Sequence, residues 1–455
     1  MEEGRKTRAV ATDLVRRLRR AGHDAFFAGG CVRDMLLGRE PSDYDIATSA
    51  RPEAVARLFA ETVAVGEAFG VVRVRADGEE FDVATFRVEG PYSDGRRPDT
   101  VRFASAREDV LRRDFTINGL LYDPLTKEVL DWVGGEADLQ AGLIRAIGDP
   151  AARFEEDRLR LLRAVRFATQ LGFHLERGTR RALVCLAAEV ASVSGERIRE
   201  EVKRLLLARR RKSGLRLLDA VGLLAVLLPE VTAGKGVPQG ESAHPEGDVF
   251  EHTLLAISKL ARPKWPLVLA LLLHDVGKPV TFVRRPQITF YGHEAEGEVL
   301  AREVCHRLKM SREERETVAW LVRNHLRLRD AREMRRSRLR QLLAHPLFED
   351  LAELSRADAL ASTRDLSAYE FVRGAQKELG DTHELPQPLV RGTDLLAMGV
   401  AEGPLMGELL RRVQEEQLEG NISSKEEALA LVSRLLREGL PRTGEKRSGP
   451  DRLSR

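Results

Sequence analysis

Residues 27 to 45 read FAGGCVRDMLLGREPSDYD, and this stretch predicts a strand, a turn, a helix and a second strand, in that order. Gly29 and Gly30 indicate a strand-to-helix turn, where backbone N–H groups can approach a phosphate closely. Arg33 follows on the first turn of the helix, where it can hold the same phosphate. Asp43 and Asp45 are two residues apart, so on a strand both carboxylates point to one face.

A pair of carboxylates on one face suits Mg²⁺, because two such ions can align a hydroxyl with a nucleoside triphosphate. Asp82 lies on a neighbouring predicted strand and is a candidate third carboxylate for the same catalytic site. Each feature alone is weak evidence for a catalytic site, because two adjacent glycines usually form only a turn and an Asp-x-Asp sequence usually lies in a solvated loop. Their order and spacing together favour the functional interpretation.

The sequence around this stretch predicts a small α/β head followed by a long helical body. Apolar residues at helical spacing predict a helix over 6–21, and β-rich runs predict strands over 70–75 and 80–86. The turn-rich segment 90–99 is expected to be a mobile loop. From residue 157 the pattern is almost wholly helical, with breaks near 232–247 and 379–388, and the basic residues 441–455 are expected to be disordered.

Composition narrows the class of protein. A length of 455 residues suggests two or three domains, and a hydrophobic content of 43% with only 5% aromatics favours a helical core. The net charge of +3 excludes histone-like bulk charge but permits a local basic face for a polyanion. Three cysteines without a CxxC spacing argue against a disulfide framework or a zinc knuckle. Because no secretory signal or membrane-length apolar run is present, the expected location is the cytoplasm.

The motifs quoted above also carry a family resemblance. GGCVRD with DYD resembles the class II tRNA nucleotidyltransferase/poly(A) polymerase family, and the likeness continues in order over about residues 25–435. The further matching segments are Arg112-Arg-Asp-Phe-Thr-Ile-Asn118, Asp131-Trp-Val-Gly-Gly135 with Asp138, Glu156-Asp-Arg-Leu-Arg160 and Gly195-Glu-Arg-Ile-Arg-Glu-Glu-Val-Lys203. The resemblance implies an α+β fold, in which a nucleotidyltransferase-type α/β palm head precedes an all-helical neck, an HD body and a tail.

Asp157 and Arg160 are candidates for choosing the base. Residues three apart on a helix share a face, so an acceptor and a donor project side by side. Cytosine and adenine each offer an amino donor beside a ring-nitrogen acceptor, which this pair complements, whereas guanine and uracil present an acceptor to the carboxylate. The resemblance implies the same role. The alternative is an ordinary solvated helix face.

The resemblance also assigns further contacts to the nucleotide. It places Arg113, Arg163 and Arg166 at the triphosphate, and Asp114 and Asn118 at the ribose. As a bare sequence, the segment around Arg113 could instead be a helix N-terminal cap. The expected nucleotide-binding set is therefore Gly29, Gly30, Arg33, Arg113, Asp114, Asn118, Asp157, Arg160, Arg163 and Arg166.

A second constellation lies in the helical body. His252, the His274-Asp275 pair and Asp358 resemble the ligand set of the HD phosphohydrolase family, with His293 and His325 as candidates for a second metal. Imidazoles and carboxylates from separate helices can hold a divalent metal that activates water, and such ligands favour Ni²⁺, Co²⁺ or Mn²⁺. Single histidines are more often core or surface residues than ligands. Seven of the ten histidines, however, lie between 244 and 345, in the order that this family uses.

Two basic clusters are candidate contacts for an RNA duplex backbone, although either could be a solvated face. They are Arg204 with 209–212, and the arginines of 332–340. The expected domains are a head over 1–147, a neck with the base-recognition helix over 148–215, an HD body over 216–370 and a tail over 371–440.

The resemblance, together with these features, implies a Mg²⁺-dependent enzyme that adds C and A from CTP and ATP to the 3′ end of tRNA, without a nucleic-acid template. Asp43, Asp45 and Asp82 are the expected catalytic residues, and the first two are the expected Mg²⁺ ligands. No membrane or DNA partner is expected. Alternatives within the family are an A-only adding enzyme and a poly(A) polymerase. The loop at 94–98 argues against a C-only enzyme, because C-only members of the family are thought to have lost it. An alternative of another class is an HD phosphohydrolase whose head only docks RNA.

Overall fold

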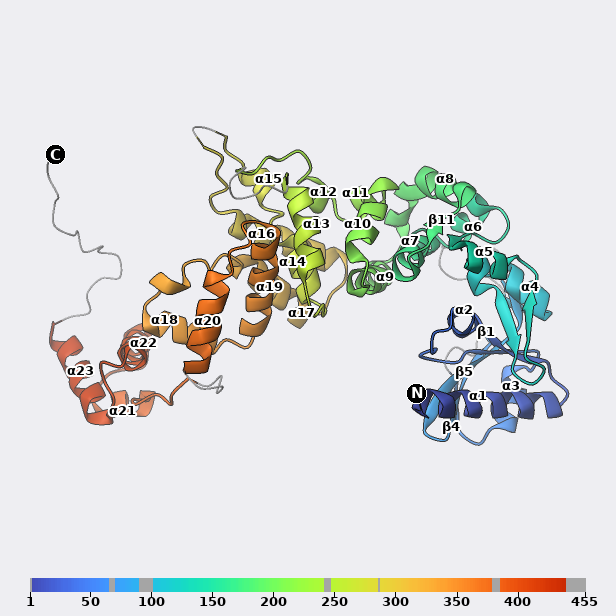
Figure 1. Cartoon of the computed structure of the whole chain (residues 1–455). Helices are drawn as coiled ribbons and strands as arrows, with labels where there is room; N and C mark the ends of the chain where they lie inside the picture. Colours follow the sequence, from blue (N-terminus) through green and yellow to red (C-terminus); the bar gives the residue numbers. More distant parts are fainter. Residues whose placement is uncertain are drawn as a thin grey trace. The chain divides into compact units, whose positions relative to one another are not determined.

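The computed structural model describes residues 2–64, 70–89, 101–240, 247–284, 287–378 and 385–438 (Figure 1). The predicted mobile loop 90–99 and the predicted disordered segment 441–455 lie outside the described residues. The chain divides into two compact units, residues 1–323 with 361–363, and residues 324–360 with 364–455. The finer division into head, neck, body and tail stays a prediction.

A mixed sheet organises the N-terminal part of the first unit. Its strand order is β3-β4-β5-β2-β1-β8-β9, with β2 and β5 parallel and every other pair antiparallel. The strands are β1 (Ala25–Ala28), β2 (Ile46–Thr48), β3 (Thr62–Ala64), β4 (Val71–Ala76), β5 (Glu79–Thr85), β8 (Leu120–Asp123) and β9 (Glu128–Asp131). Short two-stranded sheets pair β6 (Arg87–Glu89) with β7 (Val101–Phe103), and β10 (Leu143–Ile144) with β11 (His174–Leu175).

The core of this sheet includes β1, an interior strand that is buried along its whole length. An apolar run such as Ala-Phe-Phe-Ala suits a strand covered on both faces. Phe26 and Ala28 pack with Phe86, Val110 and Leu121 in one cluster. The helices of this region are α1 (Glu2–Arg20), α2 (Gly30–Leu36), α3 (Pro52–Leu58), α4 (Ala106–Leu111) and α5 (Gly135–Ala141), with a short 3₁₀ helix at Thr116–Asn118.

Helices make up nearly all of the rest of the first unit (Figure 1). α7 packs against α9 and α10, and it is amphipathic with a wide buried face. The helices up to residue 232 are α6 (Pro150–Glu156), α7 (Leu159–Leu171), α8 (Arg177–Leu186), α9 (Gly195–Leu207), α10 (Arg211–Ala220), α11 (Leu223–Leu227) and α12 (Pro229–Thr232). They are followed by α13 (Val249–Lys259), α14 (Leu267–Leu273), α15 (Lys278–Thr281), α16 (His293–Arg307) and α17 (Arg312–Asn324).

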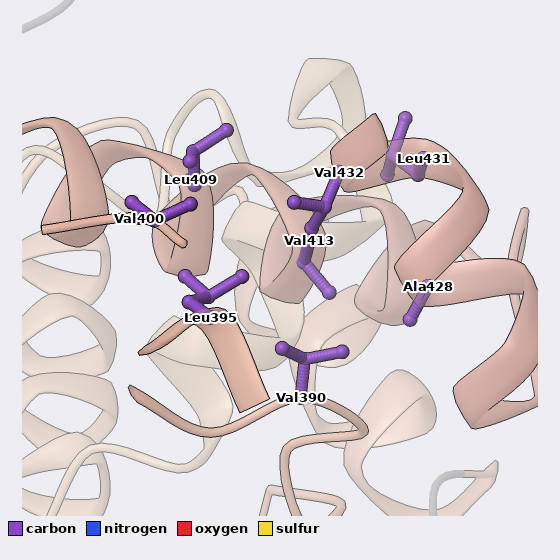
Figure 2. Close-up of a cluster of buried hydrophobic side chains, with 8 residues drawn as sticks. All are labelled: Val390, Leu395, Val400, Leu409, Val413, Ala428, Leu431 and Val432. Atoms are coloured by element: carbon purple, nitrogen blue, oxygen red, sulfur yellow. The ribbon is translucent and has the colours of Figure 1, made fainter. Parts of the chain in front are cut away.

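All the regular secondary structure among the described residues of the second unit is helical. Its helices are α18 (Arg336–Leu343), α19 (Phe348–Ala361), α20 (Ser367–Glu378), α21 (Gly392–Ala397), α22 (Pro404–Glu419) and α23 (Lys425–Glu438). α21, α22 and α23 share a small core of their own. Figure 2 shows this core, in which Val390 and Leu395 face Leu409 and Val413, with residues of α23 beside them.

The structure confirms the predicted fold class and its main elements. The helix predicted over 6–21 is α1, and the two predicted strands are β4 and β5, which pair in antiparallel register. Among the described helices, not one has the length and apolar character that crossing a membrane requires.

Candidate active site

The predicted carboxylate pair lies at the entrance to β2. Tyr44 is buried, whereas Asp43 and Asp45 on either side are exposed, so the two carboxylates share one face as expected. The pairing ladder itself begins only at Ile46, so the prediction that both residues lie within the strand is wrong. The Asp45 carbonyl nevertheless accepts a hydrogen bond from the Ala28 backbone N–H at 3.0 Å, which fixes this segment against β1.

The third predicted carboxylate, Asp82, lies close to this pair. β2 and β5 run parallel with Ile46 opposite Val83, so Asp45 and Asp82 precede paired residues. Loss of water around its carboxylate raises the pKa of Asp45 to about 6, and the negative charges of Asp43 and Asp82 push in the same direction. Three carboxylates crowded in this way form a site whose charge favours a divalent cation.

Arg73 is a partner of Asp82 that sequence reasoning missed. It lies directly opposite Asp82 on β4, and its Nε donates to Asp82 Oδ1 at 2.8 Å while Nη2 donates to Oδ2 at 3.3 Å. The alternation of the two strands places both side chains on one face. Arg73 therefore holds the third carboxylate in a two-pronged ion pair.

The glycine turn brings two arginines together. Gly29 has a φ of 71°, which favours glycine, and a Cβ at this position would lie 3.2 Å from Arg113 Nη1. Arg33 lies on α2, where its Nε and Nη2 donate to the Asp34 carboxylate and its Nη1 donates to Asn118 Oδ1 at 2.9 Å. The close approach of backbone and guanidinium explains why this position lacks a side chain.

Asp114 and Asn118 connect the head to α7. Asn118 Nδ2 donates to Asp114 Oδ1 at 3.0 Å, and Arg163 of α7 donates through Nε and Nη2 to Asp114 Oδ2, with 2.8 Å for the Nε contact. Burial alone would raise the pKa of Asp114, but Arg163 and the Asn118 hydrogen bond outweigh it and hold the pKa at about 2. Asp114 is therefore ionised, and it links Arg33, Asn118 and Arg163 in one network.

Asp109 positions the two arginines of the next motif. Its buried carboxylate accepts from Arg112 at 2.7 Å through one oxygen and from Arg113 at 2.9 Å through the other. Arg113 also donates to the Asn118 carbonyl at 3.2 Å. Spacing of three and four residues on α4 and its end signals such pairs, so Asp109 could have been found from the sequence.

The predicted base-reading pair does not lie on a single helix. α6 ends at Glu156, Asp157 has an extended backbone, and α7 begins at Leu159. The Asp157 side chain accepts from the Leu159 backbone N–H at 3.1 Å, and the extended backbone of Asp157 interrupts the helix that was expected. Arg197 of α9, whose role sequence reasoning missed, donates to the second Asp157 oxygen at 2.8 Å.

Arg160 and Arg166, which were expected to contact the base and the triphosphate, are instead paired with neighbouring protein groups. Arg160 is buried, and it donates to the Arg112 and Arg153 carbonyls and to Glu156 at 2.7 Å. Arg166 forms a buried ion pair with Glu201 of α9 and donates to Gln170. This position suits a contact between α7 and α9, and it does not favour the expected triphosphate contact for Arg166.

A second cluster gathers in the helical part of the first unit. His252 comes from α13, His274 and Asp275 follow α14, and His293 begins α16. His252 Nε2 lies 3.3 Å from His274 Nε2, and Asp275 Oδ2 lies 3.1 Å from His274 Nε2 and 3.6 Å from His252 Nε2. His293 Nε2 lies 3.5 Å from Asp275 Oδ1. Several nitrogen and oxygen donors thus converge from separate helices.

The hydrogen bonds of this cluster prepare it for a metal. His274 Nδ1 faces the Leu271 carbonyl and His293 Nδ1 faces the Phe290 carbonyl, each at 2.8 Å. A proton on Nδ1 leaves the Nε2 lone pair directed at the cluster. Burial lowers the pKa of His293, which favours the neutral ligand form, while the pKa of Asp275 is held well below its usual range because His274 and Lys278 outweigh its burial. The donor set therefore fits a divalent transition metal.

Lys278 is a buried neighbour of this cluster that sequence reasoning did not single out. Its ammonium donates to Asp275 at 2.7 Å and to Gln239 at 2.6 Å. The remaining predicted ligands, His325 and Asp358, belong to the second unit, where both are buried. Asp358 accepts from Arg329 at 3.2 Å. Their part in a metal site stays a prediction.

The two basic clusters differ in exposure. In the first, Arg211 is buried and donates to the Ile257 and Leu260 carbonyls, so it packs α10 against the end of α13 and is not available to RNA. In the second, Arg340 donates to the Leu418 carbonyl, whereas Arg335, Arg336 and Arg338 are exposed.

Models of known families match three parts of the chain. Residues 25–145 match the poly A polymerase head domain, residues 172–235 match the probable RNA and SrmB-binding site of polymerase A, and residues 249–363 match the HD domain. The first match covers the carboxylate pair and the glycine turn. The third covers the histidine cluster.

Curated relatives and solved structures extend this likeness. The chain is 38% identical over 430 residues to a CC-adding tRNA nucleotidyltransferase of Thermus thermophilus, with 90% of this chain and 93% of that protein covered. It is 47% identical over 208 residues to a CCA-adding enzyme of Leuconostoc mesenteroides, where the match spans about half of each protein, 46% and 52%. The crystal structure of the Bacillus stearothermophilus CCA-adding enzyme in complex with CTP superimposes with a TM-score of 0.72 at 27% identity, covering 94% of this chain and 98% of that one.

Proposed function

This chain belongs to the class II tRNA nucleotidyltransferase/poly(A) polymerase family, and we propose that it completes the CCA end of tRNA from CTP and ATP without a nucleic-acid template. The observation that carries the proposal is the position of Arg113, which acts electrostatically on the Asp45 carboxylate and donates to the Asn118 carbonyl. Asn118 in turn accepts from Arg33 and donates to Asp114, which Arg163 holds. This arrangement connects the metal-binding carboxylates with the arginines. It places cationic donors for a triphosphate next to acidic ligands for a metal. The expected setting is the cytoplasm.

Asp43 and Asp45 would hold Mg²⁺, since both residues reach the surface and their carboxylates are close enough for the charge of Asp43 to raise the pKa of Asp45. A Mg²⁺ ion held there would supply Lewis-acid chemistry, which would polarise the α-phosphate and favour loss of the proton from the attacking hydroxyl. Asp82, held by Arg73, lies where it adds negative charge to the same site. The 3′ hydroxyl of the RNA then displaces pyrophosphate from the α-phosphate.

The nucleotide would lie between the glycine turn and α7. Arg33, Arg113 and Arg163 bind the triphosphate, because guanidinium groups form paired hydrogen bonds with phosphate oxygens. Asp114 and Asn118 bind the ribose, and Asp157 with Arg160 reads the base. In this assignment, Arg197 orients the carboxylate that receives the amino group of C or A.

The alternatives within the family differ in which nucleotides are added. The Thermus thermophilus relative, which matches most of the chain, is named a CC-adding enzyme, and this favours C-only addition as the second candidate. The loop 94–98, from which the sequence argument against C-only addition came, lies outside the described residues.

The test is to incubate the protein with tRNA that lacks its last three nucleotides, and to read product length. Full CCA addition gives two added residues with CTP alone and three with CTP and ATP together. Two residues under both conditions would replace the proposal with CC addition. A single A added only to tRNA that ends in CC would indicate A-only addition, and a ladder with ATP alone would indicate a poly(A) polymerase. No incorporation by wild type, with hydrolysis intact, would leave the head as an RNA-docking module.

The histidine cluster supports a second proposed activity. His252, His274, His293 and Asp275 would hold Ni²⁺, Co²⁺ or Mn²⁺ and serve the hydrolysis of a phosphate ester, such as a 2′,3′-cyclic phosphate at an RNA end. Release of a phosphate monoester from this substrate in the presence of each metal tests the activity. Absence of hydrolysis with all of them would contradict it.

A further inference from the structure

Phe167 lies on α7 among three arginines that come from two parts of the first unit. Phe167 is buried, with 7% of the residue exposed. The Cζ atoms of Arg33 and Arg163 each lie 5.3 Å from the ring centroid, and that of Arg166 lies 3.9 Å away. Phe115 meets the ring edge-on at 5.9 Å. One phenyl ring therefore contacts an arginine of α2 and two arginines of α7.

Arg33 and Arg163 are also connected on their polar sides. Arg33 donates to Asn118, Asn118 donates to Asp114, and Arg163 donates to the other oxygen of Asp114. The ring of Phe167 closes this chain of contacts into a circuit. The circuit joins α2, the 3₁₀ helix at Thr116–Asn118 and α7. A shift of α7 would therefore move Arg33, which follows the glycine turn.

The electrostatics of the ring explain what it contributes. The face of an aromatic ring is negative and attracts a cation within about 6 Å of its centroid, and arginine is the cation that most often uses it. A guanidinium has five N–H donors in its plane, and contact through its flat face uses none of them. Arg33 makes three hydrogen bonds to Asp34 and Asn118 among the described residues, so donors remain for a phosphate.

We propose that Phe167 is a positioning residue for nucleotidyl transfer: its ring holds the Arg33 and Arg163 guanidiniums at the triphosphate and couples the head to the base-reading helix. The inference rests on the proposed nucleotide roles of Arg33 and Arg163. A purely apolar side chain of the same volume would fill the space but would not attract the three guanidiniums, of which Arg166 is already held by Glu201. The effect on the enzyme should therefore follow the electrostatics of the ring and not its size.

The test replaces Phe167 in the full-length protein by 3,5-difluorophenylalanine and by pentafluorophenylalanine, which nearly keep its shape while weakening and then reversing the charge of its face. KM for CTP is expected to rise stepwise, on the order of tenfold for the pentafluoro ring, with kcat and Tm nearly unchanged. The matched control is Phe154 of α6, which is 1% exposed and has no guanidinium over its ring among the described residues. The same replacements there should leave KM unchanged.

Two outcomes would overturn the inference. If KM for CTP stays unchanged across the Phe167 series, the ring only fills space. If KM rises equally in the Phe154 series, the change is a general response to fluorination. Arg163→Met separates this inference from the assignment beneath it. If Arg163→Met raises KM while the fluorinated series does not, only the role of Phe167 fails. If Arg163→Met itself leaves KM unchanged, the assignment of Arg163 to the triphosphate fails as well.

Discussion

The Asp157 carboxylate is held by the Arg197 guanidinium of α9 across 2.8 Å, although the two residues are forty positions apart. The other oxygen of Asp157 caps the Leu159 backbone N–H. The carboxylate expected to select C and A is thus fixed from two sides, and its orientation depends on α9 as well as on α7.

Arg197→Ala is predicted to impair the preference for CTP and ATP more than the nucleotidyl-transfer step itself. Removing a hydrogen bond to a charged group costs about 1.5–3 kcal/mol, which corresponds to roughly a tenfold to hundredfold loss in kcat/KM for CTP and ATP. The rates with UTP and GTP should change much less. Single-nucleotide incorporation with each triphosphate measures this ratio. Arg199→Ala, on the same helix but away from Asp157, is the control and should keep the wild-type ratio. An unchanged ratio for Arg197→Ala would remove Arg197 from base selection.

Gly29→Ala is predicted to weaken nucleotide binding because its new methyl group would press on Arg113 Nη1 at 3.2 Å. Gly38→Ala is a control for an alanine at positive φ, since Gly38 has a φ of 68° and no heavy atom within 4 Å of the added Cβ. Gly29 combines its φ of 71° with a ψ of −124°, outside the left-handed helical region, so Gly29→Ala adds backbone strain to the contact with Arg113. KM for CTP should rise several-fold in Gly29→Ala alone. Equal KM values for the two variants would contradict the prediction.

The raised pKa of Asp45, about 6, predicts how the metal-free protein responds to pH. Between the ordinary value of 3.8 and about 6, the folded state binds more protons at this site than the unfolded state. Stability therefore falls as pH rises through this window. Asp45→Asn should raise Tm above pH 6 in the absence of divalent metal, and should abolish nucleotide incorporation. Thermal unfolding at pH 5 and pH 7.5 checks the sign, because wild type and variant should differ less at pH 5. A lower Tm for the variant at pH 7.5 would contradict it.

Below about pH 6, metal binding by wild type is expected to weaken, because Mg²⁺ must displace a proton from Asp45. Titration calorimetry in buffers of different ionisation enthalpy would count the released proton. Asp82→Asn removes one of the charges that raise the pKa of Asp45, so Mg²⁺ binding by this variant should begin to weaken at a lower pH than in wild type. If binding weakens at the same pH in both proteins, Asp82 does not influence the Asp43 and Asp45 pair.

The histidine cluster is predicted to fail independently of the carboxylate pair. His274→Ala with Asp275→Asn should abolish binding of Ni²⁺ or Mn²⁺ and any phosphate-ester hydrolysis, while nucleotide addition stays within about twofold of wild type. Metal content after dialysis and single-turnover CMP addition measure the two properties. Circular dichroism is the control for folding, since both positions are buried. Loss of nucleotide addition in a folded double variant would show that the two sites are coupled.

Much of the candidate site could be predicted from the sequence because its motifs are local. Asp43 and Asp45 are both exposed on either side of the buried Tyr44, as their spacing indicates. Gly29 is needed where Arg113 approaches the turn. The break at Asp157 was missed, although aspartate is a strong helix-starting residue and could have signalled it.

The partners of these residues could not be predicted because they depend on register and packing. Arg73 meets Asp82 only because β4 and β5 pair in one particular register. Arg166 looked like a phosphate contact from its spacing of three along α7, but the packing of α7 against α9 turns it toward Glu201. No local pattern distinguishes an arginine that faces a ligand from one that faces a neighbouring helix.

The seven residues of α14, Leu267–Leu273, are buried on every side, and the chain runs directly from them into His274 and Asp275. Amide hydrogens in such a segment exchange with solvent only when the surrounding unit opens as a whole. In deuterium oxide, α14 should therefore be among the last segments of the first unit to take up label, well after the exposed helix ends. His274 and Asp275 thus follow one of the most rigid segments of the first unit. A metal that binds there would meet ligands that are already in position.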